Sequence, residues 1–257
     1  MRRLNHVLKL AGFLGFLSIP HLANKFGANQ ELFLTWDKTI NEFLSNPKHY
    51  LLSLLYTLSV GAIAVFMSTI IGVASGILFA YFERWLGFME TVMKFIWSVP
   101  LIVVAVYLNI FIDNSVLFVI ITGVFLGIFP IISYTYNKAI EPNDGILSIV
   151  ATFNMSKKAE FFYLRLREIF KNFSVALDQS IPLTYIGVTM GEYTVGGVAG
   201  TNNYGLGSDF QFGMNNTQYE VVYVSIIFMV FLVYASGEAS RIPSIARSFI
   251  IKLCRRR

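Results

Sequence analysis

Four side chains in one otherwise apolar stretch have the chemistry to bind or relay a proton or an ion. Asp178, Tyr185 and Glu192 recur every seven residues, and Thr189 lies between the last two. This spacing places them on one face of a helix. An ionised side chain at the centre of a membrane costs about 2.5–3.5 kcal/mol, so such groups normally face a bundle interior or an aqueous path. The pattern predicts that these four residues line a translocation path.

Two other interpretations of the acids stay open. Glu192 could instead form hydrogen bonds with neighbouring helices and so fix their packing, with no contact to a transported solute. Asp178 lies near one end of the apolar stretch, from which a side chain can reach water. The sequence alone does not choose between a path and a packing role.

A second unusual stretch is the charged insert "DGILSIVATFNMSKKAEFFYLRLREIF", which starts at Asp144. Apolar residues at i, i+3, i+4 and i+7 from Ile146 to Phe153 predict a short amphipathic helix, which Asn154 interrupts. Seven charges follow between Lys157 and Lys171. Two interpretations fit: the helix lies on the membrane surface, or its apolar face enters a groove on a partner protein.

The elements that position these residues are membrane helices. The chain is 55% hydrophobic and only 14% charged, whereas soluble proteins carry about 25% charged residues. A bilayer core needs roughly 20 apolar residues per helix, and uncharged runs of 33, 18 and 24 residues occur. We expect an all-α polytopic membrane protein with about six transmembrane helices. The predicted spans are Leu10–Asn24, Tyr50–Phe82, Phe95–Ile112, Asn114–Asn137, Phe173–Val198 and Val221–Gly237.

The distribution of basic residues predicts the orientation. If both termini are cytoplasmic, 17 of the 20 Lys and Arg residues lie inside, and only Lys25, Lys38 and Lys48 lie outside. This asymmetry is typical of the positive-inside rule. It also explains the net charge of +5 without a nucleic-acid partner. The first span could alternatively be a signal peptide, because Met1-Arg2-Arg3 precedes it.

Sequence signatures of enzymes are missing. No phosphate-binding loop, nucleophile elbow or H-E-x-x-H motif occurs. The glycine-rich "GGVAGTNNYGLG" lacks the lysine of a phosphate loop and is predicted to lie outside the cell. Cys254 is the single cysteine, and the three histidines have no ligand spacing, so we expect no metal site. Any energy source must therefore come from another subunit.

Three glycine pairs fall inside predicted spans. Small residues four positions apart let membrane helices approach closely, and we interpret these pairs as packing positions. They are Gly72/Gly76, Gly123/Gly127 and Gly187/Gly191.

Several segments, taken in order, resemble one transporter family. "ILSIVATFNMS" from Ile146 resembles the "LLEAARTLGAS" docking motif of permease subunits of binding-protein-dependent ABC importers, particularly the nitrate/sulfonate/taurine-type branch. "SVPLIVVAVYLNIF" from Ser98 is similar to the proline-bearing third span of that family. "YIGVTMGE" and "NYGLGSDF" resemble its "AW…AE" and "SGLGYLI" segments. The resemblance covers roughly Tyr50 to Arg241.

The docking motif is degenerate in this chain. Ser148, Ile149 and Val150 stand where the family has Glu, Ala and Ala, and Asn154 replaces its glycine. Asn adopts left-handed backbone more readily than most residues, so Asn154 is expected to make the same turn. The later "LP" of the family is Leu166-Arg167 here.

The resemblance implies a type I ABC importer permease fold and a role as a non-catalytic subunit that works by alternating access. It implies ATPase subunits that carry ATP and Mg, a second permease subunit (homodimer or heterodimer), an external solute-binding protein and surrounding membrane lipid. The implied location is the bacterial cytoplasmic membrane. ATPase coupling is assigned to Ile149, Val150, Phe153, Asn154, Met155 and Ser156, and the external gate to Gly196, Gly197, Tyr204, Gly205 and Gly207.

The expected organisation has three parts. Residues 1–49 hold the first span and an external segment. Residues 50–241 form the permease core, with a cytoplasmic coupling loop at about 138–172, and residues 242–257 form a basic tail. Two alternatives to an importer subunit are an ion-coupled secondary transporter that uses Glu192 as proton carrier and a membrane scaffold without transport. The secondary transporter would usually show inverted repeats with broken helices, and none is found in the sequence.

Overall fold

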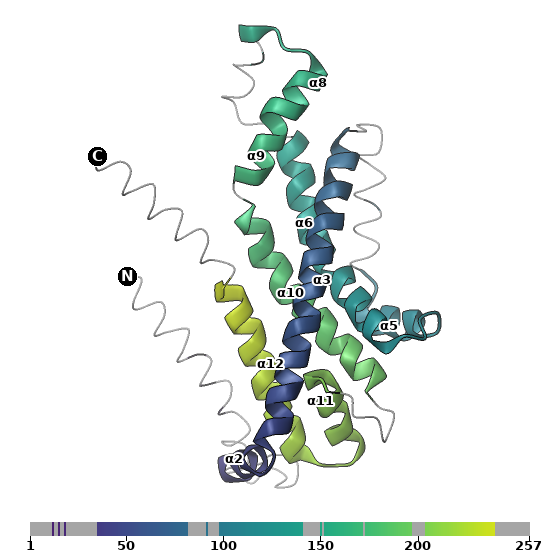
Figure 1. Ribbon diagram of the computed structural model, residues 1–257, viewed down its shortest axis with the longest axis vertical. Helices are drawn as coiled ribbons and strands as arrows, with labels where there is room; N and C mark the ends of the chain where they lie inside the picture. The colour runs from purple at the N-terminus through teal and green to yellow at the C-terminus, as the bar shows by residue number, and fades with distance from the viewer. Residues whose placement is uncertain are drawn as a thin grey trace, which may run out of the picture. The chain divides into compact units, whose positions relative to one another are not determined.

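The described part of the chain is helical. The computed structural model (Figure 1) describes residues 35–81, 98–140, 152–171, 173–196 and 204–239, with the single positions 12, 15, 18, 91 and 150. Every regular element within these ranges is a helix. The all-α class expected from the composition is therefore confirmed, whereas the predicted first span and the basic tail lie outside the described residues.

Three of the described helices are long and apolar enough to cross a membrane. They are α3 (Pro47–Tyr81), α6 (Ser115–Ile140) and α12 (Tyr219–Ala239), the last over its first 20 residues. At about 1.5 Å per residue, α3 is roughly 52 Å long, which exceeds a hydrocarbon core of about 30 Å. α3 must therefore tilt or extend beyond the bilayer. These helices confirm three of the predicted spans.

Helix α10 (Ser174–Val195) coincides with the predicted span at 173–198. Its 22 residues suffice to cross a membrane, but it is less apolar than α3, α6 and α12 because it carries acids, amides and hydroxyls. Pro182 lies inside it, as Pro130 does inside α6. α10 carries all four residues predicted to line the path.

The predicted continuous span at 95–112 is wrong in extent. Helix α5 covers only Leu101–Asn109, nine residues, or about 14 Å. Pro100 is extended at φ −57° and ψ 130° and forms the N-cap, and the residue before a proline is biased away from helical backbone. Beyond α5, Asn114 begins α6 by accepting the Leu117 N–H at 3.0 Å. The run therefore holds a short helix that starts after Pro100, and a new helix begins after Asn114.

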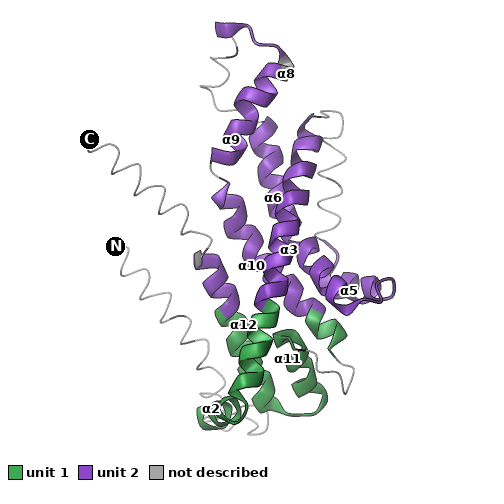
Figure 2. Cartoon of the chain, viewed as in Figure 1, with its two compact units in different colours: residues 1–57, 192–231 green, residues 58–191, 232–257 purple. Residues whose placement is uncertain are grey.

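The chain divides into two compact units (Figure 2). Unit 1 comprises Met1–Thr57 and Glu192–Phe231, and unit 2 comprises Leu58–Gly191 and Leu232–Arg257. Three helices change unit along their length: α3 after Thr57, α10 before Glu192 and α12 after Phe231. Each unit is described separately below.

Glycines line the helix contacts within unit 2. A Cβ atom on Gly123 would lie 2.6 Å from Val188 Cγ2, and one on Gly187 would lie 2.5 Å from the Thr122 carbonyl oxygen. On α3, a Cβ on Gly72 would lie 2.8 Å from Ile131 Cγ2. These separations are too short for any side chain, so the backbones approach closely at the predicted glycine pairs. Their packing role is confirmed.

From Lys157 onward, the charged insert forms a helix with one irregular turn. α8 (Lys157–Glu160), the π-helix η2 (Phe161–Arg165) and α9 (Leu166–Lys171) follow one another without a gap. α6 contacts both η2 and α9, beside which it runs in Figure 1. A small apolar core lies there, formed by Ala80, Ala139, Phe161 and Ile169.

Unit 1 contains two short helices, α2 (Trp36–Ser45) and α11 (Leu206–Asn215). Aromatic rings hold α2 in place, because Phe43 lies 5.6 Å from Phe228 of α12 and 6.2 Å from Tyr50 of α3 between ring centroids. α11 begins directly after Gly205, whose φ of 152° is a conformation that L side chains rarely adopt. The polar site described next lies at this helix start.

Candidate functional sites

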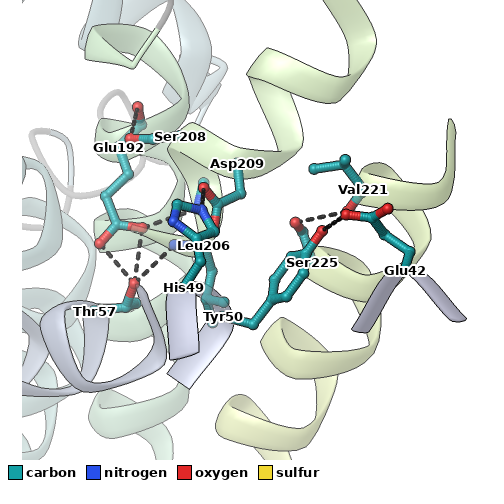
Figure 3. Close-up of polar contacts among 11 residues, drawn as sticks. Glu42, His49, Tyr50, Thr57, Glu192, Leu206, Ser208, Asp209, Val221 and Ser225 are labelled. Carbon is teal, nitrogen blue, oxygen red and sulfur yellow. Dashed lines mark hydrogen bonds and ion pairs between the residues drawn. The ribbon is translucent and has the colours of Figure 1, made fainter. Parts of the chain in front are cut away.

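The Glu192 carboxylate lies at the start of α11 (Figure 3). Glu192 is 1% exposed. Its two carboxylate oxygens accept hydrogen bonds from Thr57 Oγ1 at 2.8 and 3.0 Å, and one of them also accepts the Gly207 N–H at 2.9 Å. Acceptors at a helix N-terminus satisfy N–H groups that the helix leaves unpaired, and a negative charge there interacts favourably with the helix dipole. Glu192 therefore caps α11.

The Thr57 hydroxyl completes this cap. It donates to Glu192 and accepts the Leu206 N–H at 3.0 Å, so one side chain of α3 joins α10 to α11. A Cβ atom on Gly205 would lie 2.9 Å from Glu192 Cδ, which leaves room only for glycine. We call Thr57, Glu192 and the N–H groups of Leu206 and Gly207 the α11 cap.

The predicted gate residues gather around this cap where they are described. Ser208 Oγ donates to the Glu192 carbonyl oxygen at 3.2 Å, and a Cβ on Gly196 would lie 2.5 Å from the Ser208 side chain. Tyr204 is 39% exposed and its ring lies 5.9 Å from that of His49. Gly197 lies outside the described residues. A gating role for these residues stays a prediction.

The remaining predicted path residues have separate surroundings in unit 2. Tyr185 is buried, and its hydroxyl donates to the Leu58 carbonyl oxygen at 3.3 Å. Thr189 donates to the Ile186 carbonyl oxygen of its own helix at 3.1 Å. Asp178 lines an open cavity of about 590 Å³ between α6 and α10. The other residues that line this cavity are Phe129, Pro130, Ser133, Gln179, Pro182 and Leu183.

For Glu192, the observed contacts match the packing interpretation. Its carboxylate accepts hydrogen bonds from α3 and α11, so it fixes the packing of α10 against these two helices. Whether solute passes near it is a property of an assembled transporter, so its path role stays a prediction.

An ion pair that the sequence did not indicate lies at the first turn of α11. His49 Nε2 lies 2.8 Å from Asp209 Oδ1 (Figure 3), and the side chains are 45% and 7% exposed. Burial raises the pKa of Asp209, whereas the Ser53 hydroxyl and His49 oppose this rise. The two partners are 160 positions apart, so no local pattern could have linked them.

The predicted coupling residues form an exposed turn before α8. Phe153 is 73% exposed, and Asn154 has a φ of 45°, the left-handed conformation expected of it. The Met155 N–H donates to the Val150 carbonyl oxygen at 3.3 Å. Ser156 Oγ then accepts the Ala159 N–H at 3.3 Å and so caps the next helix. Ile149 lies outside the described residues, and contact with an ATPase stays a prediction.

Arg165 and Glu160 form the second site that sequence reasoning missed. Arg165 Nε and Nη2 contact Glu160 Oε1 at 2.8 and 2.5 Å, and Nη1 donates to the Ala139 carbonyl oxygen at 2.7 Å. Charges five positions apart do not share a face of an α-helix, and the extra residue in the π-turn brings them together.

Within the described residues, no group of three His, Cys, Asp or Glu side chains is placed to hold a metal ion. The polar sites above hold helices together and use no metal-ligand geometry. The absence of a cofactor from this chain remains an expectation.

The described features define a class of protein: a helical membrane protein with spans of membrane length and an exposed, charged insert between two of its long helices. Residues 69–240 match the family described as the binding-protein-dependent transport system inner membrane component, and the chain belongs to this family. It is therefore a transport protein, a permease component of ABC importers. No curated protein matches the chain.

Proposed function

We propose that the chain is the membrane-spanning permease subunit of an ATP-driven importer that receives a small solute from an external binding protein. The family match carries this proposal, because residues 69–240 include the insert and the helices on both sides of it. Solute would cross by alternating access, in which the helices open to one side of the membrane at a time. The energy would come from ATP and Mg on a separate ATPase subunit, since the sequence has no phosphate-binding loop.

The exposed turn at 152–156 is the proposed contact with that ATPase. Phe153 presents a large apolar side chain to solvent at a left-handed turn, and Ser156 fixes the helix that follows. An isolated aromatic side chain of this kind fits a groove on a partner. A second permease subunit, identical or related, would complete the assembly and supply the other half of the path.

We place this turn, both termini and the basic residues of the insert in the cytoplasm. Under this proposal about six helices cross a bacterial cytoplasmic membrane. The substrate class proposed from the resemblance is that of the nitrate/sulfonate/taurine-type branch, with selectivity set largely by the binding protein.

Reconstitution tests the function. The tagged chain is purified from its own host in mild detergent, and associated subunits are identified and reconstituted in proteoliposomes. Uptake that requires ATP and an associated ATPase supports the importer. Uptake driven by a proton gradient without any ATPase would instead support a secondary transporter.

Cysteine labelling tests the topology in a Cys254→Ser background. Asn203→Cys and Asn216→Cys should react with an impermeant maleimide in intact cells. Ser156→Cys should react only after permeabilisation, and its labelling in intact cells would overturn the proposed orientation.

A further inference from the structure

Arg165 connects the charged insert to the last turn of α6. Its guanidinium has donors directed at two groups: the Glu160 carboxylate, one turn earlier in the insert, and the Ala139 carbonyl oxygen, one residue before the end of α6. The Arg165 side chain is 24% exposed and that of Glu160 is 11% exposed. A planar guanidinium with fixed donors holds such a geometry more rigidly than an ammonium group does.

The π-turn makes this connection possible. The Leu166 N–H donates to the Phe161 carbonyl oxygen, five positions back. The extra residue in this turn brings Arg165 and Glu160 onto the same side as Ala139. Such single π-turns within α-helices are rare, and they occur frequently at functional sites.

Apolar contacts reinforce the same connection. Phe161 is 7% exposed and Ile169 is fully buried, and both pack with Ala139 of α6 and Ala80 of α3. The Tyr81 ring at the end of α3 meets Phe161 edge-on, with centroids 5.7 Å apart. The insert is therefore packed against the ends of two membrane-length helices.

The insert also continues directly from the exposed turn at 152–156. It is helical from Lys157 to Lys171 without a gap, so a displacement of the turn would be carried into the part of the insert that packs against α6.

We propose that Arg165 is a positioning residue that passes movement of the turn at 152–156 to α6. In this view the Arg165–Glu160–Ala139 connection makes the insert and the end of α6 move as one body during the ATPase cycle. This inference rests on the proposed function, because it assumes that an ATPase moves the turn.

The experiment compares Arg165→Met with Arg167→Met in the reconstituted complex. Arg167 is an exposed arginine two positions along the same insert and serves as the matched control. Three quantities are measured: the amount of ATPase that copurifies, the rate of ATP hydrolysis and the solute taken up per ATP hydrolysed. A purely structural role would lower the yield of complex without changing uptake per ATP.

We expect Arg165→Met to keep the ATPase and to hydrolyse ATP, while uptake per ATP falls about fivefold, the low end for coupling between sites. Glu160→Gln should have a smaller effect of the same kind, and the double variant should be no worse than Arg165→Met alone. Arg167→Met should match the parent. Unchanged uptake per ATP in Arg165→Met would overturn the inference.

Arg165→Lys covers the case in which the methionine variant does not insert. It keeps the charge but cannot reach the carboxylate and the carbonyl with a fixed fork, so uptake per ATP should still fall, whereas parental uptake per ATP would overturn the inference. A parent that copurifies with no ATPase contradicts the proposed function itself, before either variant is compared.

Discussion

The α11 cap and the Arg165 site each join three segments through one ionisable side chain, but their surroundings differ. Glu192 is 1% exposed and its partners are uncharged, namely a threonine hydroxyl and a backbone N–H. Arg165 is 24% exposed and pairs with an acid as well as a carbonyl oxygen. A buried group that loses its partners is costly, whereas a partly exposed one can exchange them for water.

This contrast suggests that the two sites have different roles. The α11 cap holds α3, α10 and α11 in one arrangement, and its loss should appear first as lost stability. The Arg165 guanidinium is more open to water and can exchange its partners more readily, although Glu160, 11% exposed, would lose its counter-charge. This arrangement suits an element that transmits movement. The predictions that follow test this division, beginning with the largest expected effect.

Glu192→Ala should be the most destabilising of these changes. It leaves the Thr57 hydroxyl and the Gly207 N–H without their buried acceptor, and we expect the free energy of unfolding to fall by about 3 kcal/mol. Glu192→Gln keeps one oxygen acceptor, so it should insert and lose less stability while altering transport. Thermal unfolding in detergent measures the effect, and the control is Glu220→Ala, at a partly exposed glutamate in the first turn of α12. Parental stability of Glu192→Ala would contradict the capping role.

Phe153→Ala should act on binding and leave stability unchanged. The side chain is 73% exposed, so its removal costs the isolated chain little. A central apolar anchor is often worth 2 kcal/mol or more, which corresponds to roughly a 30-fold loss of ATPase affinity. Titration of the ATPase onto the purified permease measures this, and Lys157→Ala is the control with a smaller expected effect. If Phe153→Ala kept full affinity while the insert bound lipid vesicles, the membrane-surface interpretation would gain support.

Thr57→Val tests how much the hydroxyl of Thr57 contributes to the α11 cap. It keeps the shape of the side chain but removes the hydroxyl that donates to Glu192 and accepts from Leu206. We expect a loss of about 1.5 kcal/mol in unfolding free energy. Thr57→Ser, which keeps the hydroxyl, should lose clearly less. Equal losses in the two variants would show that packing and not hydrogen bonding sets the effect.

His49→Gln should have the smallest effect. His49 is 45% exposed, so we expect a loss of about 0.5 kcal/mol near neutral pH. Because the pKa of Asp209 is raised above its ordinary value in the folded chain, this carboxyl makes folding less favourable as pH rises from the ordinary to the raised pKa. The difference between variant and parent should shrink below that pKa, where Asp209 is neutral. Unfolding measured across this pH range checks it, and a gap that widened on acidification would contradict the ion pair.

The sequence predicted the features that depend on local composition. Uncharged runs marked α3, α6 and α12 because a bilayer requires long apolar helices. The left-handed turn at Asn154 followed from its residue type. The extent of the span at 95–112 was predicted wrongly because the run was judged by its lack of charges, although Pro100 within it disfavours helical backbone at Val99.

Polar partners that lie far apart in the sequence were not predictable. Thr57 and Glu192 are 135 positions apart, and Arg165 and Ala139 are 26 apart. The regular seven-residue spacing on α10 correctly indicated one helix, but no spacing on that helix indicates which neighbour supplies a hydroxyl. Such pairs depend on how the helices pack against one another.

The close glycine contacts also limit which amino-acid substitutions this chain can accept during evolution. At Gly123 and Gly187 even one methyl group would collide with a neighbouring helix, so drift at these positions should be nearly absent. On α3, Leu55 and Phe66 are 60% and 64% exposed and can exchange with other apolar residues at little cost. A saturation library selected for function should therefore retain glycine at the first two positions and accept Leu, Ile, Phe or Met at the other two. Substitutions should thus accumulate unevenly around each helix, on the sides turned away from its neighbours.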